Sequence, residues 1–106
     1  MTNASDAPAN STITRYQDSL YHDLNTPEEI LAIRQEVRRF ADEHVAPVAY
    51  AIGHTEESVA AFPRDLFAKM AKAGLFRIPF AADVGGRGLK YPATATAVMI
   101  EELAYH

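Results

Sequence analysis

The stretch from Phe62 to Gly88 constrains the fold more than any other part of this chain, because it holds a short helix with marked ends and then a turn-rich loop. Pro63 suits the first position of a helix, where its missing N–H leaves no hydrogen bond unmade. Gly74 suits the left-handed position that follows a helix C-terminus. The residues after it that favour turns are Pro79, Gly85, Gly86 and Gly88. The stretch therefore predicts one short helix followed by a glycine-rich loop.

Within this helix, Leu66, Phe67 and Met70 recur at helical spacing and predict one apolar face. Asp65 near the start and two lysines near the end complement the helix dipole. Leu75, just beyond the helix, is expected to fold back onto Met70 as the apolar contact of a Schellman motif. We therefore expect this helix to dock through one face and to stop at the glycine.

An earlier helix is predicted to begin at Thr26. Thr26 suits the capping position, Pro27 the first helical position, and Glu29 closes a capping box. Pro47 is expected to kink or interrupt this helix, and Gly53 to end it. Apolar residues recur within it at intervals of three and four, which predicts burial along one side. They are Ile30, Ile33, Val37, Phe40 and Ala41.

The charged residues of this earlier helix fall mostly on its other faces. Arg38 with Asp42 and Arg39 with Glu43 have i,i+4 spacing, and each such pair contributes only ~0.2–0.5 kcal/mol. We interpret them as a solvated helix face rather than a functional site. The residues from 54 to 58 are expected to form a polar connection to the next helix.

A last helix is predicted from Pro92 to the end of the chain. Its apolar residues cover most of the circumference, and a helix of this kind needs burial on several sides. They are Ala95, Val98, Met99, Ile100 and Leu103. Only the side that holds Thr94, Glu101 and Tyr105 is polar. Because three short helices offer little cover, we expect the sequence to stop inside a domain.

The composition fits one small globular unit, since 48% of the 106 residues are hydrophobic and 23% are charged. The net charge of −4 gives no basic footprint for nucleic acid. The chain has no cysteine, which excludes disulfides, a thiolate nucleophile and a cysteine zinc site. No apolar run approaches the ~20 residues that span a bilayer, and no signal peptide pattern is present. We expect a cytoplasmic protein.

Residues 1–24 contain few large apolar side chains, so we expect them to form a disordered or weakly docked N-terminal tail. Residues 25–106 are expected to form the folded part. The predicted fold class is all-α, with three main helices and a glycine-rich loop before the last of them.

The residues that could suggest catalysis, metal binding or phosphate binding are all interpreted as structural. Glu101 and Glu102 are neighbours that point ~100° apart on a helix, so they are not expected to share a substrate. The four histidines lack metal-ligand spacing. The loop from Gly85 to Gly88 matches neither phosphate-binding glycine pattern, and a structural turn is the preferred interpretation.

Three pieces of sequence, taken in order, resemble the N-terminal helical domain of the acyl-CoA dehydrogenase family. They read F-P-R-D-L-F-A-K-M-A-K-A-G-L-F-R-I-P, then A-A-D-V-G-G-R-G-L, then V-M-I-E-E-L-A-Y. The helix that begins T-P-E-E-I resembles the opening helix of that domain, including the proline at Pro47. The resemblance covers about residues 24–106 and implies an incomplete helical domain in the segment 25–106. The family pattern often has a proline where this chain has Ala81 and an aromatic residue where it has Val84.

The resemblance implies that the full-length protein is an FAD-binding oxidoreductase of fatty acid or amino acid catabolism. In the family, a glutamate of the C-terminal domain removes the α-proton of an acyl-CoA thioester while a hydride leaves to the flavin, which gives the 2-enoyl-CoA. An electron-transfer acceptor and a homo-oligomeric state are implied as partners. The base and the flavin-binding motifs lie outside these 106 residues, so no catalytic, cofactor-binding or metal-binding residue is assigned. Leu103 and Tyr105 are expected at the edge of the substrate pocket.

Two alternative interpretations fit the same sequence. One is a flavin-dependent monooxygenase or acyl-CoA oxidase of the same fold, which the presence or absence of the catalytic glutamate would distinguish. The other is a stand-alone helical interaction module. A stop codon directly after His106 would favour the module, and a reading frame that continues into a β-domain would favour the enzymes.

Overall fold

Helices account for all the regular secondary structure in the computed structural model, which describes residues 26–106. The α-helices are α2 (Glu28–Phe40), α3 (Ala46–Gly53), α4 (Arg64–Lys72) and α5 (Pro92–Leu103). The shorter segments are the π-helical turn η4 (Ala41–Val45) and the 3-10 turns η5 (Val59–Ala61), η6 (Leu75–Arg77) and η7 (Ala82–Val84). The predicted all-α fold is confirmed, whereas the expectations for residues 1–24 lie outside the described part of the chain.

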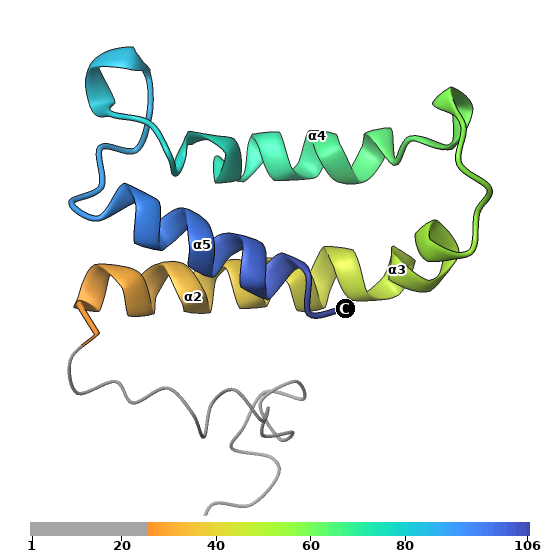
Figure 1. Cartoon of the computed structure of the whole chain (residues 1–106), viewed down its shortest axis with the longest axis horizontal. Helices are drawn as coiled ribbons and strands as arrows, with labels where there is room; N and C mark the ends of the chain where they lie inside the picture. The colour runs from red at the N-terminus through yellow and green to blue at the C-terminus, as the bar shows by residue number, and fades with distance from the viewer. Residues whose placement is uncertain (1–25) are drawn as a thin grey trace, which may run out of the picture.

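The segments α2, η4 and α3 follow one another without a break and form one long bent helix (Figure 1). Helix α5 packs along α2, and these two make the most extensive contact between elements. Helix α4 runs in the upper part of the view and contacts the π-helical turn. The three main helices of the prediction are therefore the α2–α3 rod, α4 and α5.

The core lies where α2, α5 and the segment after α4 meet. Its buried side chains come from α2 and α5 and from the turn that follows Gly74. They are Ile30, Ile33, Val37, Phe40, Leu75, Ile78, Ala95, Val98 and Met99. Leu66 and Met70 of α4 pack against this cluster from one side. The predicted stripe of α2 is thus confirmed, and Ala41 is fully buried as well.

The predicted helix ends agree with the structure at three places. Gly74 follows α4 in the left-handed conformation with φ of 76°, and its N–H bonds the carbonyl of Ala71 at 3.0 Å, as in a Schellman motif. Helix α3 ends at Gly53, and α5 begins with Pro92. The helix is not interrupted at Pro47, which lies in the first turn of α3; the irregularity expected there is the π-helical turn just before α3.

The predicted capping box of α2 is wrong, because the Glu29 carboxylate is used elsewhere. Its two oxygens accept hydrogen bonds from the backbone N–H groups of Lys90 at 3.0 Å and Tyr91 at 2.9 Å. Those groups precede α5, so Glu29 fastens the start of α5 to the start of α2. Pro63 also differs slightly from expectation, since it borders α4 as the cap residue rather than as the first helical residue.

Two predicted apolar faces need correction. Phe67 is 48% exposed and contacts the rings of Phe62 and Phe76 instead of entering the core. On α5, Ile100 is 57% exposed, whereas Glu102 is fully buried. The reason is that α5 turns Glu102 toward the arginines of α2, which satisfies the carboxylate and leaves Ile100 on the outside.

The connection after α3 also contains the turn η5, whose cap residue Ser58 accepts a hydrogen bond from the N–H of Ala61.

Candidate functional site

The most polar contact between the helices is an ion cluster that joins α2 to α5. The Arg34 guanidinium donates to Glu101 at 2.5 Å and to Glu102 at 2.7 Å. Arg38 donates through Nε and Nη2 to the two oxygens of Glu102, at 3.0 and 2.9 Å. The Glu102 side chain has no exposed surface, while the two arginine side chains keep 21% and 27% of theirs. The predicted solvated face is therefore wrong for Arg38, which serves as a partner for a buried carboxylate.

The ion cluster also changes the ionisation of its arginines. Burial, the largest influence on the pKa of Arg34, lowers it, but the hydrogen bonds and charges of Glu101 and Glu102 outweigh burial and raise the pKa above its ordinary value. Arg34 therefore stays protonated, and its folded-state pKa lies above the unfolded one. The stability it contributes is fully present below the unfolded pKa and is lost only as the pH rises through the folded pKa, in strongly alkaline solution.

The sequence did contain a signal for this cluster. Arg34 and Arg38 are spaced i,i+4 at the border of the apolar stripe, so both lie beside the face that docks. Glu101 and Glu102 both bind Arg34 in the structure. The ~100° between neighbouring positions on a helix had predicted that these two carboxylates would not act on a common partner. Both carboxylates are bound by arginine, so this cluster is an arrangement for holding α5 against α2.

The glycine-rich loop is a second ordered feature, and its polar groups bond within the protein. The Arg87 guanidinium donates to both carboxylate oxygens of Glu36, at 2.8 and 2.6 Å. It also donates to the carbonyls of Ala73 at 3.0 Å and Gly74 at 3.2 Å, just after the end of α4. Hydrogen bonding to Glu36 outweighs burial and raises the pKa of Arg87. Arg87 thus ties the loop to both α2 and α4.

The loop does not fit a phosphate group. The N–H groups of residues 85 to 88 donate to the carbonyls of Ala82, Ala81, Arg77 and Phe80 respectively. Phosphate cradles need such N–H groups to point at the ligand. The loop is therefore a structural turn, as the sequence predicted.

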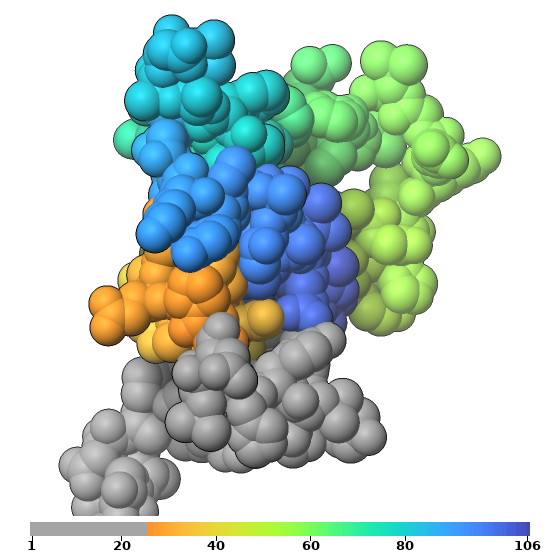
Figure 2. Space-filling model, turned by 60° about the vertical axis from the view of Figure 1, so that its left-hand side comes forward, coloured from red at the N-terminus to blue at the C-terminus, as the bar shows by residue number. Residues whose placement is uncertain are grey.

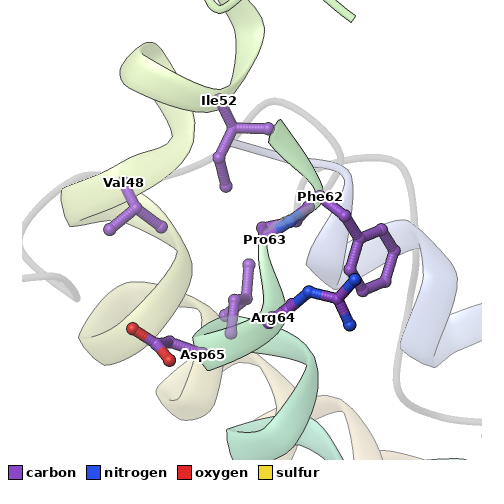
Figure 3. A pocket seen from close by; sticks show the side chains of 7 residues that line it. Val48, Ile52, Phe62, Pro63, Arg64 and Asp65 are labelled. Atoms are coloured by element: carbon purple, nitrogen blue, oxygen red, sulfur yellow. The ribbon is translucent and has the colours of Figure 1, made fainter. Parts of the chain in front are cut away.

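A hollow lies between α3 and α4, which we call the α3–α4 groove. One part has a volume of about 330 Å³, and the adjoining part about 420 Å³. Both parts share Ile52, Phe62 and Pro63 as lining residues. Figure 3 shows Val48 and Ile52 on α3 facing Pro63 at the start of α4. The groove is apolar at its centre, with Arg64, Asp65 and Glu57 also among its lining residues.

The two residues expected at a substrate pocket lie elsewhere, at the end of α5. Leu103 packs partly buried against the core. Tyr105 is 44% exposed, and its ring meets that of His106 edge-on. Neither lines the α3–α4 groove. Their expected role at a pocket edge thus stays a prediction.

Within residues 26–106, no group of three or more histidine, aspartate or glutamate side chains is arranged to hold a metal ion. Within the same residues, no helix is long and apolar enough to cross a bilayer.

Comparison with known proteins identifies relatives for most of the chain. A 67-residue part, 63% of the chain, is 39% identical to the benzylmalonyl-CoA dehydrogenase of Aromatoleum aromaticum and covers 17% of that protein. A 66-residue part, 62% of the chain, is 39% identical to the short-chain specific acyl-CoA dehydrogenase of Clostridium acetobutylicum and covers 16% of it. The (2S)-methylsuccinyl-CoA dehydrogenase of Cereibacter sphaeroides is 35% identical over 73% of the chain, which is 13% of its own length.

The matched region is therefore a small fraction of each relative. No solved structure matches the chain. The sequence pattern that describes the N-terminal domain of acyl-CoA dehydrogenases matches residues 27–106, which include every helix of the described residues. This match extends over most of the chain and agrees with the all-helical fold. The chain thus belongs, through this N-terminal domain, to the acyl-CoA dehydrogenase family.

Proposed function

We propose that this chain is the N-terminal segment of an acyl-CoA dehydrogenase-like flavoenzyme. In the full-length protein it would support the oxidation of an acyl-CoA thioester to the 2-enoyl-CoA, with FAD as cofactor and an electron-transfer protein as acceptor. The observation that carries the proposal is the family match over residues 27–106. The relatives in Aromatoleum aromaticum and Clostridium acetobutylicum are both named as dehydrogenases of CoA thioesters, which supports the same reaction class.

Within that enzyme, the segment has a supporting role. The polar groups of the glycine-rich loop are occupied by Glu36 and by backbone carbonyls, so they are not available to a diphosphate. The ion cluster is likewise closed by arginine–carboxylate bonds. The segment therefore contributes a wall, with Leu103 and Tyr105 at the edge of the acyl pocket, while other parts of the enzyme supply the flavin site and the catalytic base. We place the enzyme in the cytoplasm as a homo-oligomer.

A domain exchange tests this function. Residues 27–106 replace the corresponding part of the Clostridium acetobutylicum short-chain enzyme, which is 39% identical over 66 residues. The chimera is expected to purify with flavin absorbance near ~450 nm, a property of the cofactor, and to reduce an artificial electron acceptor when an acyl-CoA is added. The matched control carries the corresponding segment of the Aromatoleum aromaticum relative. Loss of flavin in our chimera, while the control keeps it, would contradict the proposal.

The isolated 106-residue chain is expected to bind neither FAD nor an acyl-CoA. The reason is that the described residues offer no free phosphate-binding loop and that the net charge is −4. The measurement is titration of the chain with FAD by absorbance and with an acyl-CoA by calorimetry. Saturable binding of either ligand at micromolar concentration would show that the segment has a ligand site of its own.

A further inference from the structure

Helix α4 is held by far fewer buried side chains than α2 and α5. None of its nine residues is buried, whereas α2 and α5 bury four residues each. Two of its side chains, Leu66 and Met70, pack against the core, and both stay partly exposed. Figure 2 shows α4, in green to turquoise, along the upper edge of the molecule. Elements with few buried apolar contacts are the ones that open locally in a folded protein.

The helical structure of α4 depends on this docking, because the helix is short. An isolated helix of fewer than about 12 residues is marginal in water, and α4 has nine. When Leu66 and Met70 leave the core, the backbone hydrogen bonds of α4 are therefore expected to break as well. Undocking thus exposes the amides of α4 to solvent, where hydrogen exchange detects it.

The two ends of α4 are held very differently. Before the helix, residues 54–60 are all exposed, so they form a connection that restricts it little. After the helix, Gly74 has a φ of 76°, and Leu75 and Ile78 are fully buried. The chain is therefore anchored in the core directly after Gly74 but only loosely held before the helix begins. An opening movement of α4 has its fixed point at Gly74.

Arg87 strengthens this fixed point. Its guanidinium donates to the carbonyls of Ala73 and Gly74 and, through both terminal nitrogens, to Glu36 of α2. The chain just after α4 is thus bonded to α2 through one side chain. These bonds lie beyond the last residue of the helix, so they hold the pivot in place without holding the helix itself against the core.

We propose that α4 is a lid that pivots at Gly74 and opens locally while α2 and α5 stay packed against each other. In the open state Leu66 and Met70 leave the core, and the side of η4 that α4 contacts becomes accessible. The contacts that carry this inference all lie within residues 26–106. The opening is therefore a property of the 106-residue chain and needs neither a second copy nor a further domain.

Hydrogen exchange of the whole chain, followed residue by residue by NMR, tests this opening. The amide of Met70 in α4 is expected to be protected about a hundredfold less than the amides of Val37 in α2 and Val98 in α5. Urea provides a second measurement, because its effect scales with the surface that an opening exposes. Opening of the lid exposes little surface, so low urea concentrations are expected to accelerate exchange at Val37 and Val98 but hardly at Met70.

Two core variants distinguish the lid from the rest of the fold. Leu66→Ala removes a contact that is lost in both the open state and the unfolded state. It is therefore expected to accelerate exchange at Met70, Val37 and Val98 by one common factor, about fivefold or more. Ile30→Val is the matched control, because Ile30 is buried near the start of α2, whereas the main contacts of α4 are with η4 and η6. It is expected to accelerate exchange about fivefold at Val37 and Val98 and to leave Met70 unchanged, since the α2–α5 core stays packed when the lid opens.

Three results would overturn the lid. If Met70 shares the protection and the urea dependence of Val37 and Val98, α4 opens only when the whole chain unfolds. If Ile30→Val accelerates exchange equally at all three positions, α4 and the α2–α5 core open as one unit. A Met70 amide without any protection in the parent chain would mean that α4 is not closed at all, so there would be no lid to open.

Discussion

Replacement of Arg38 by methionine is expected to destabilise the chain by about 3 kcal/mol, although the arginine is partly exposed. The substitution removes the two hydrogen bonds that Arg38 donates to Glu102 and keeps much of the apolar stem. The Glu102 side chain has no exposed surface, so the carboxylate cannot replace these bonds with water. For a folded unit of this size, the loss corresponds to a fall of about 15 °C in the melting temperature.

The neighbouring arginine is the matched control for this experiment. Arg39 is exposed on the same helix and makes no ion pair within residues 26–106, so Arg39→Met is expected to change stability by less than ~0.5 kcal/mol. The measurement is thermal unfolding followed by circular dichroism at neutral pH. Equal melting temperatures for Arg38→Met and Arg39→Met would mean that the ion cluster contributes nothing to stability.

Replacement of Gly86 by alanine is expected to cost about 3 kcal/mol or more, because the added methyl group has no space. A Cβ at this position would lie 1.9 Å from the carbonyl oxygen of Phe80 and 2.2 Å from its carbonyl carbon. Both are backbone atoms, so the loop itself must move. Its movement would disturb the bond from Gly88 N–H to the Phe80 carbonyl and would displace Arg87 from Glu36.

Gly53→Ala is the control for the glycine substitution. A Cβ at Gly53 meets no atom within 4 Å, and the residue has no positive φ. Alanine there is expected to stabilise helix α3 by about 0.5–1 kcal/mol, owing to its higher helix propensity. The free energy of unfolding of both variants is measured by urea denaturation. An unchanged value for Gly86→Ala would show that the loop tolerates the shift.

The helix ends were predictable from the sequence because they depend on local backbone chemistry. Pro92 begins α5, and Gly74 follows α4 in the left-handed conformation, as their backbone preferences require. Gly53 also ends its helix, but without a positive φ. The stripe of α2 was also predictable, since five apolar residues at helical spacing leave one face to bury. The family resemblance followed from the same local pieces and their order, and the match over residues 27–106 confirms it.

The ion cluster was not predictable in the same way. Glu102 lies 64 residues beyond Arg38 in the chain, so no local pattern links them. A glutamate on a helix is normally assigned to the exposed side. The sequence therefore predicted a buried face of α5 that included Ile100, whereas in the structure Glu102 is buried and Ile100 is exposed. The capping box failed for a related reason, because Glu29 is used by Lys90 and Tyr91 rather than by its own helix. In each case a glutamate side chain accepts hydrogen bonds from residues distant in sequence, which a local pattern does not predict.

The π-helical turn between α2 and α3 gives the chain a place where a change of length by one residue can be absorbed. The N–H of Ala46 bonds the carbonyl of Ala41, five residues back, so this turn holds one residue more than an α-helical turn. Deletion of Glu43, which is exposed, would restore an ordinary turn and keep the helix continuous. The four residues of an α-helical turn sweep nearly the same angle as the five residues of the π-helical turn, so α3 would keep its orientation relative to α2. Val48 and Ile52 would still face Pro63, so a single deleted codon would remove the bulge without redirecting the apolar face of α3 or breaking the rod.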